Sequence, residues 1–121
     1  MAKKASAFFL INALAITTFL SPAAAWEIGD KDENGYWFLY EEPIEGVYTN
    51  TWWGKQKGSS GSEVDVSIRA EGKTADFSGV LHIYCNNNSH AWKSGRNFDS
   101  PVPVDQIRDL APNKVITWAR I

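Results

Sequence analysis

The chain has 121 residues, which is enough for one domain, and twelve Lys and Arg against fourteen Asp and Glu give a formal net charge of −2. A nucleic-acid surface needs clustered Lys and Arg, so this balance argues against DNA or RNA as a partner. Cys85 is the only cysteine, which excludes an internal disulfide and leaves stability to packing.

The first 25 residues have the organisation of a secretory signal peptide. Lys3 and Lys4 form a positive head, residues 7–20 are mostly apolar, and residues 21–25 supply a helix breaker and an Ala-x-Ala cleavage site. The apolar run is shorter than the roughly 20 residues that span a bilayer. We therefore expect a signal peptide at residues 1–25 and a secreted or periplasmic product, residues 26–121, that forms a single β-rich domain without a transmembrane segment.

Acidic residues are concentrated at the start of this product. Residues 27–45 carry seven acidic side chains and one basic one, Lys31. We expect a solvated acidic surface here, and a docking surface for a basic partner or a cation is the alternative. All six Trp and all four Tyr follow the predicted cleavage site, so aromatic rings provide much of the material for the core.

Residues 30–41 match the calcium-binding loop of the EF-hand at every specified position. That loop depends on a following helix, which brings its twelfth residue back to the ion. Five residues of helix advance about 7.5 Å, whereas five residues of strand advance about 16 Å, and residues 36–40 favour a strand. We therefore expect a hairpin turn at Asn34, with a weak calcium site formed by Asp30, Asp32 and Asn34, without Glu41, as the alternative.

Alternation of apolar and polar residues predicts most of the strands. In residues 63–70, Val64, Val66, Ile68 and Ala70 share one face, and polar side chains occupy the other. Residues 58–62, rich in Gly and Ser, predict a flexible loop. Similar patterns and β-favouring residues predict further strands, some of them short, at residues 26–28, 36–40, 47–53, 80–85 and 89–93.

The C-terminal part contains one predicted helix and one predicted strand. Residues 105–111 lie between two prolines, with Ile107 and Leu110 three residues apart, which indicates a helix of one or two turns. The β-branched residues in 114–121 indicate a final strand. The strands follow each other without regular helix alternation, so we predict an all-β fold: a small antiparallel sandwich or barrel of six or seven strands with one short helix near the C-terminus.

The adjacent pair Trp52 and Trp53 is the strongest indication of binding. Neighbouring residues in a strand face opposite ways, so if one ring fills the core, the other faces solvent, a loop or a ligand. An exposed indole suits sugars and protein interfaces alike. The predicted ligand-binding residues are Trp52, Trp53, Tyr48, Tyr84 and Trp92.

Catalytic chemistry has weaker support. Cys85 and His82 lie three apart in one predicted strand and so face opposite sides, whereas His90 could approach either face across a turn. We expect Cys85 to be a buried apolar residue. Acid pairs are conceivable at Asp65 with Asp76, or at Glu41 with Glu42.

The sequence therefore favours a small exported binding or accessory module for a protein or a cell-envelope glycan, without catalysis and without a cofactor. Two alternatives remain. One is a small secreted enzyme that uses Cys85 and His90 or paired carboxylates. The other is a weak calcium-binding module built on the loop from Asp30 to Asn34.

Overall fold

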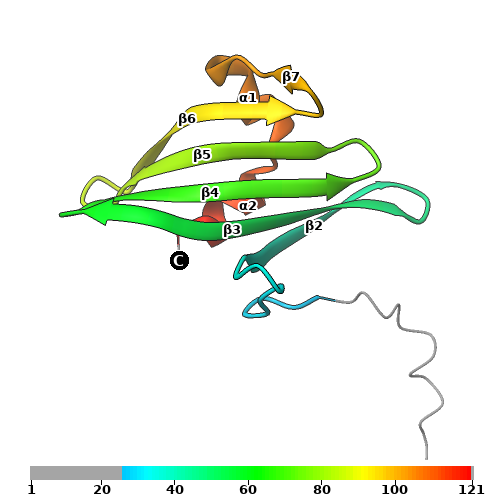
Figure 1. The fold of residues 1–121 in the computed structure, drawn as a ribbon, viewed down its shortest axis with the longest axis horizontal. Helices are drawn as coiled ribbons and strands as arrows, with labels where there is room; N and C mark the ends of the chain where they lie inside the picture. Colours follow the sequence, from blue (N-terminus) through cyan, green and yellow to red (C-terminus); the bar gives the residue numbers. More distant parts are fainter. Residues whose placement is uncertain (1–25, 121) are drawn as a thin grey trace, which may run out of the picture.

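The computed structural model describes residues 26–120, so the predicted signal peptide lies outside the described residues. Six strands form one antiparallel sheet, in which each strand pairs with the next along the chain, and two short helices follow (Figure 1). The elements are β2 (Trp37–Glu45), β3 (Tyr48–Ser60), β4 (Glu63–Gly72), β5 (Asp76–Tyr84), β6 (Ser89–Asn97), β7 (Ser100–Pro101), α1 (Val104–Leu110) and α2 (Asn113–Ala119).

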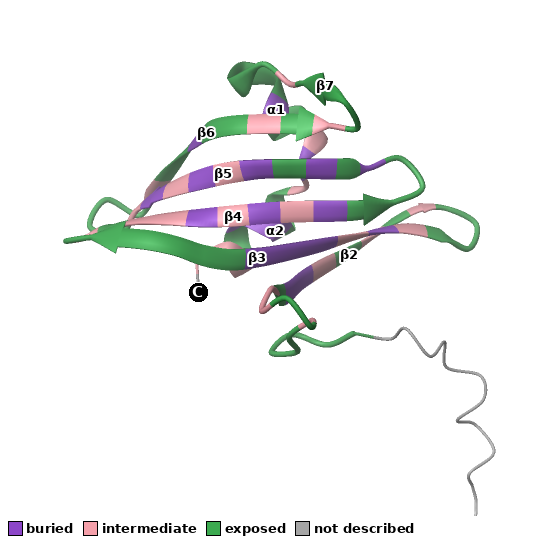
Figure 2. Ribbon diagram, in the orientation of Figure 1, coloured by how far each residue is buried: buried purple, intermediate pink, exposed green. Residues whose placement is uncertain are grey.

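The two faces of the sheet differ as the alternation in β4 predicts. Val66, Ile68 and Ala70 are buried on one face, whereas Ser67 and Arg69 on the other are partly exposed. Figure 2 shows the same change from buried to more exposed residues along the central strands. We call the face that packs against the helices the inner face and the opposite one the outer face.

The helices bring the remaining core side chains to the inner face. Helix α1 contacts β6, and α2 contacts β2 and β3. Ile107 of α1 and Val115 of α2 are completely buried, in one cluster with Trp52 and Phe77 of the sheet. The ring centroids of Trp52 and Phe77 are 5.4 Å apart. Aromatic packing therefore provides the centre of a core that no disulfide supports.

The predicted class of mostly antiparallel β structure is confirmed, but a sandwich or a barrel is not. In the described residues the strands form one sheet, and the layer packed on it is helical. The order of the strands runs from β2 to β7 without pairing between these two ends. One layer of helices can bury an apolar sheet face as well as a second sheet can, so the pattern in the strands does not distinguish the two arrangements.

The predicted helix is confirmed at α1, but the predicted final strand is wrong. Most of residues 114–121 belong to α2, in which Val115 and Ile116 are buried against the sheet. β-branched residues lose less than about 1 kcal/mol each in a helix, and packing on an exposed apolar face outweighs that preference. The element type was therefore decided by the sheet that α2 covers.

Two smaller predictions also differ from the structure. Residues 58–60 extend β3 instead of forming a loop, because they pair with the start of β4, and only Gly61 and Ser62 form the turn. The predicted strand at residues 26–28 is irregular. In the part of the chain that the structure describes, we find no helix with the length and apolar character needed to cross a bilayer.

Candidate outer-face binding site

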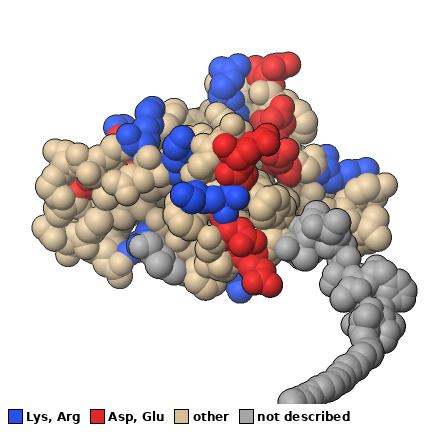
Figure 3. Space-filling model, turned by 60° about the horizontal axis from the view of Figure 1, so that its bottom comes forward, with Lys and Arg blue, Asp and Glu red and all other residues tan. Residues whose placement is uncertain are grey.

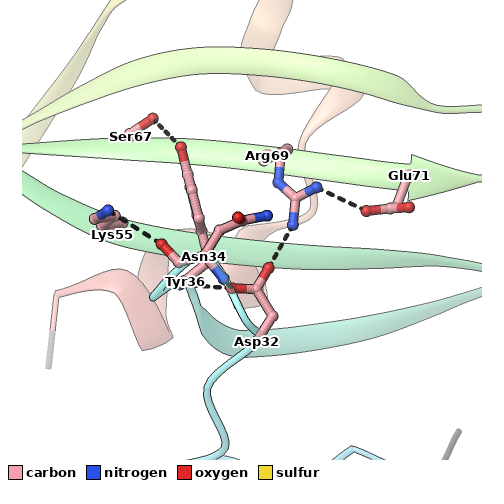
Figure 4. A network of polar contacts seen from close by, with 7 residues as sticks. All are labelled: Asp32, Asn34, Tyr36, Lys55, Ser67, Arg69 and Glu71. Atoms are coloured by element: carbon pink, nitrogen blue, oxygen red, sulfur yellow. Dashed lines mark hydrogen bonds and ion pairs between the residues drawn. The ribbon is translucent and has the colours of Figure 1, made fainter.

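The segment from Trp26 to Tyr36, which we call the N-terminal segment, folds back over the outer face. Asp32 organises its turn, because Oδ1 of Asp32 accepts hydrogen bonds from the backbone N–H groups of Asn34 and Tyr36, each at 2.9 Å. Oδ2 of Asp32 accepts a hydrogen bond from Arg69 of β4 at 2.7 Å (Figure 4). One carboxylate thus shapes the turn and ties it to the sheet.

The ring of Tyr36 provides a second attachment. The Arg69 guanidinium lies 4.9 Å from the centroid of this ring, and Nζ of Lys55 lies 5.7 Å from it. The Tyr36 hydroxyl contacts the hydroxyl of Ser67 at 3.1 Å, and Lys55 donates to the carbonyl of Asn34 (Figure 4). Cation–π and hydrogen-bond contacts together hold the segment on β3 and β4.

Trp26 packs on the sheet at the start of this segment. Its ring meets the ring of Trp53 edge to face, with centroids 4.8 Å apart. Trp53 also touches Phe38, at 5.9 Å between centroids, and is only 4% exposed. Trp26 itself is 39% exposed. The outer face therefore carries a buried indole beneath an accessible one.

Between the N-terminal segment and the sheet lies a depression of about 700 Å³, which we call the outer hollow. Two residues that line this hollow, Trp53 and Arg69, each carry a buried donor, Nε1 and Nε respectively, that has no hydrogen-bond partner among the described residues. An unpaired buried donor costs about 1–3 kcal/mol, so a ligand group that displaced the covering atoms and accepted from one of these donors would bind favourably. The residues that line the hollow are Trp26, Asp32, Glu33, Asn34, Thr49, Thr51, Trp53, Arg69, Glu71 and Gly72.

The aromatic residues predicted to bind a ligand do not form one patch. Trp52 and Trp92 are buried in the core, where both belong to the cluster under the helices. Trp53 lies on the outer face, so the predicted opposite orientation of the adjacent pair is confirmed. Tyr48 is half exposed beneath Lys73, whose Nζ lies 4.0 Å from the ring centroid, and Tyr84 packs against His82.

The residues of the calcium alternative are engaged in contacts within the protein. Asp30 accepts a hydrogen bond from the backbone N–H of Glu27, and both oxygens of Asp32 have partners. Glu41 lies in β2 and accepts a hydrogen bond from Thr49. In residues 26–120, no three His, Cys, Asp or Glu side chains converge in a way that could hold a metal ion.

The acidic first third of the product is only partly a free surface. Asp32 pairs with Arg69, and Glu42 accepts hydrogen bonds from the side chains of Trp52 and Asn50. On the face drawn in Figure 3, acidic side chains form a band with basic side chains directly beside it. Asp32 and Glu42 of this acidic segment therefore make contacts that stabilise the fold.

The expectation that Cys85 is buried is wrong, because its side chain is exposed where β5 ends in a turn.

Asp65 and Asp76 lie far apart along the sheet, since Asp65 is opposite His82 and Asp76 is opposite Glu71. Glu41 and Glu42 are neighbours in a strand and face opposite sides.

A separate polar cluster lies on the outer face of β4, β5 and β6. His82 contacts Asp65 through Nδ1 and Glu63 through Nε2, and Lys93 donates to Asp65 at 3.1 Å. The hydrogen bond from Asp65, followed by that from Glu63, raises the pKa of His82 above its ordinary value. The same histidine and Lys93 lower the pKa of Asp65. Cys85 is not part of this cluster, and it follows the last residue of β5 instead of sharing that strand with His82, as the prediction assumed.

Comparison of the chain with protein-family models, with curated proteins and with solved structures finds no match. Its function is therefore argued from its own residues.

Trp26, Arg69 and the threonines of the outer hollow were not among the residues predicted to bind a ligand. Alternation places Arg69 on the polar face of β4, and it places Thr49 and Thr51 on the same face of β3 as Trp53. The alternation in the sequence could therefore have indicated that these side chains share the outer face. The return of Trp26 over this face had no local signal, because it depends on contacts between residues as far apart as Asp32 and Arg69.

Proposed function

We propose that the processed chain is a small exported binding module, secreted or periplasmic, whose outer hollow holds a carbohydrate of the cell envelope. The observation that carries this proposal is the pair of unpartnered donors, Trp53 Nε1 and Arg69 Nε, beside the accessible ring of Trp26. Sugar hydroxyls accept such donors, and the apolar face of a sugar ring packs on an indole.

Other side chains around the hollow can accept hydrogen bonds from the hydroxyl groups of a sugar. Each hydroxyl of a sugar both donates and accepts, and the side chains of Glu71, Thr49 and Thr51 supply acceptors at the wall. The volume of about 700 Å³ lies within the range of small-molecule sites. A binding role is favoured over catalysis because Asp32 and Glu71 both pair with the same guanidinium, Arg69, an arrangement that fits a structural role for these two carboxylates.

The proposal can be tested with the protein purified after export from an expressing cell. Calorimetric titration with a panel of peptidoglycan fragments and neutral oligosaccharides should identify a saturable ligand. Trp53→Phe removes one unpartnered donor and keeps an aromatic ring, and it should weaken that binding by about fivefold, the expected effect of one hydrogen bond. Arg69→Lys removes the other donor and keeps the positive charge, but it also disturbs the ion pairs with Asp32 and Glu71, so it should weaken binding at least as much. Trp26→Ala should weaken it at least as much.

Trp37→Ala is the matched control, because Trp37 is also an exposed indole, at 45%, but does not line the outer hollow. Its binding should equal that of the wild type. The proposal is wrong if no glycan in the panel binds, or if Trp37→Ala weakens binding as much as Trp26→Ala. Retention of a protein partner that depends on Trp26, in place of a glycan, would assign the hollow to protein recognition.

A further inference from the structure

A second depression lies on the inner face, and we call it the inner hollow. Its volume is about 480 Å³. Strands β3 to β6 extend beyond the end of α2 at the left of Figure 1, so the helices leave this end of the sheet uncovered. The hollow opens beside that end of α2 and is distinct from the outer hollow, with which it shares no lining residue.

Apolar side chains form most of the inner hollow. Val64, Val66 and Ile83 come from the sheet, Leu39 comes from the edge strand, and Trp118 comes from α2. Val66 and Ile83 are buried, so the sheet forms a preformed apolar floor, while Val64 is partly accessible. A concave apolar site of this size is of the kind that holds the body of a small organic molecule.

Arg120 is the one charged side chain among the described residues that line this hollow. The lining also includes the polar side chains of Gln56 and Cys85. Partial burial and the positive charge of Arg120 lower the pKa of His90, so the field of Arg120 extends to the neighbouring strand β6. An apolar cavity with a guanidinium at its wall favours a ligand that has an apolar body and a carboxylate or similar anionic group.

We propose that the inner hollow binds a small amphipathic anion, whose apolar part packs on Val64, Ile83 and Trp118 and whose anionic group pairs with Arg120. The two hollows share no lining residue, although Ile28 and Gly29 of the N-terminal segment reach the inner hollow, so the inference uses other side chains than the carbohydrate proposal. Cys85, the only cysteine of the chain and an exposed one, lies in the wall and provides a chemical reporter.

Decanoate, kept below the concentration at which it forms micelles, is the probe. We expect saturable binding of one decanoate per chain by calorimetry, and at least a fivefold slower reaction of Cys85 with a thiol reagent when the hollow is filled. Decyltrimethylammonium, which has the same chain but a positive head group, should bind at least tenfold more weakly. Arg120→Gln should weaken decanoate binding by about fivefold to tenfold, as expected for loss of a hydrogen bond to a charged group.

Two changes fill the hollow. Val64→Phe should abolish binding, whereas Val80→Phe, which makes the same kind of enlargement on the outer face of the neighbouring strand, should leave it unchanged. Attaching a phenylmaleimide group to Cys85 of the folded wild-type protein should also block binding, and a small methylthio group should not. This second route avoids any effect on folding, because the protein is folded before it is modified.

Equal affinity for the cationic and anionic probes would overturn the proposal. So would decanoate binding that survives both Val64→Phe and the phenylmaleimide label, a rate of Cys85 modification that decanoate does not change, or the absence of saturable binding.

Discussion

Trp52 and Glu42 are joined across the first two strands by a hydrogen bond of 3.0 Å from the indole Nε1 to Oε1 of the carboxylate. The Trp52 ring is completely buried, so its one polar atom needs this partner. The same oxygen of Glu42 accepts a hydrogen bond from the side chain of buried Asn50 at 3.1 Å. An acidic side chain in the edge strand thus satisfies two polar groups at the border of the core.

Glu42→Ala should therefore destabilise the fold. Removing the acceptor leaves the indole N–H of Trp52 without its partner and deprives Asn50 of one of its contacts, for an expected loss of about 1–3 kcal/mol in the free energy of unfolding. Urea denaturation followed by tryptophan fluorescence measures this loss. Glu41→Ala, one residue away on the exposed face, should change stability by less than about 0.5 kcal/mol. Equal effects of the two substitutions would show that the hydrogen bond has no special role.

Gly72→Ala should be among the most damaging single-methyl additions in the chain. A Cβ at Gly72 would lie 2.2 Å from the carbonyl oxygen of Thr49 and 2.7 Å from Cα of Asn50, and both are backbone atoms of the paired strand. Because that strand cannot move without breaking the ladder, we expect a loss of more than about 2 kcal/mol. The comparison is thermal and urea unfolding of this variant against Gly58→Ala.

Gly58 is the matched control because a Cβ there meets no atom within 4 Å and its φ lies outside the left-handed region. Gly58→Ala should leave stability unchanged or raise it by about 0.4–1 kcal/mol through the unfolded state. A similar loss in both variants would mean that strand flexibility, and not the contact with Thr49, sets the requirement for glycine at residue 72.

Asp32→Ala should release the N-terminal segment without unfolding the sheet. It removes the ion pair with Arg69 and both hydrogen bonds that shape the turn. Hydrogen exchange measured by NMR should show the backbone amides of residues 32 and 38, which bond to Tyr36 and Asp30, exchanging about tenfold faster. Glu33→Ala is the control, and unchanged exchange in Asp32→Ala would contradict the assigned role of Asp32.

The two histidines should titrate on opposite sides of their ordinary value of 6.5. Hydrogen bonds to Asp65 and Glu63 raise the pKa of His82, whereas partial burial and the charge of Arg120 lower the pKa of His90. NMR titration of the two imidazole C–H signals, assigned with His82→Gln and His90→Gln, measures both. Two overlapping titration curves at the ordinary value would contradict this prediction.

These directions imply opposite effects on stability. The stabilising contribution of His82 is fully present below pH 6.5 and is lost as the pH rises through its higher folded-state pKa. His90 favours the neutral form in the folded state, so its contribution falls as the pH drops through 6.5. The difference in unfolding free energy between wild type and His82→Gln should therefore shrink above pH 6.5, and a difference that grew with pH would contradict the assignment.

Much of the sheet could be predicted because its information is local. The alternation from Val64 to Ala70 describes one buried and one exposed face, and it requires no knowledge of what covers the buried face. The same rule places Trp52 and Trp53 on opposite faces, as observed. The candidate sites were harder to predict from the sequence, since each hollow combines residues from three or more separate segments.

The sequence by itself determined most of the paired strands and the two faces of β4, because side-chain direction in an extended chain alternates at every residue. Only the tertiary structure decided that Val115 and Ile116 would lie in a helix and that Trp26 would pack on Trp53. Local preferences of less than about 1 kcal/mol per residue are outweighed when an apolar face becomes available for burial. That face exists only after distant strands have paired, so a local pattern could not indicate which segment covers it or where hollows remain.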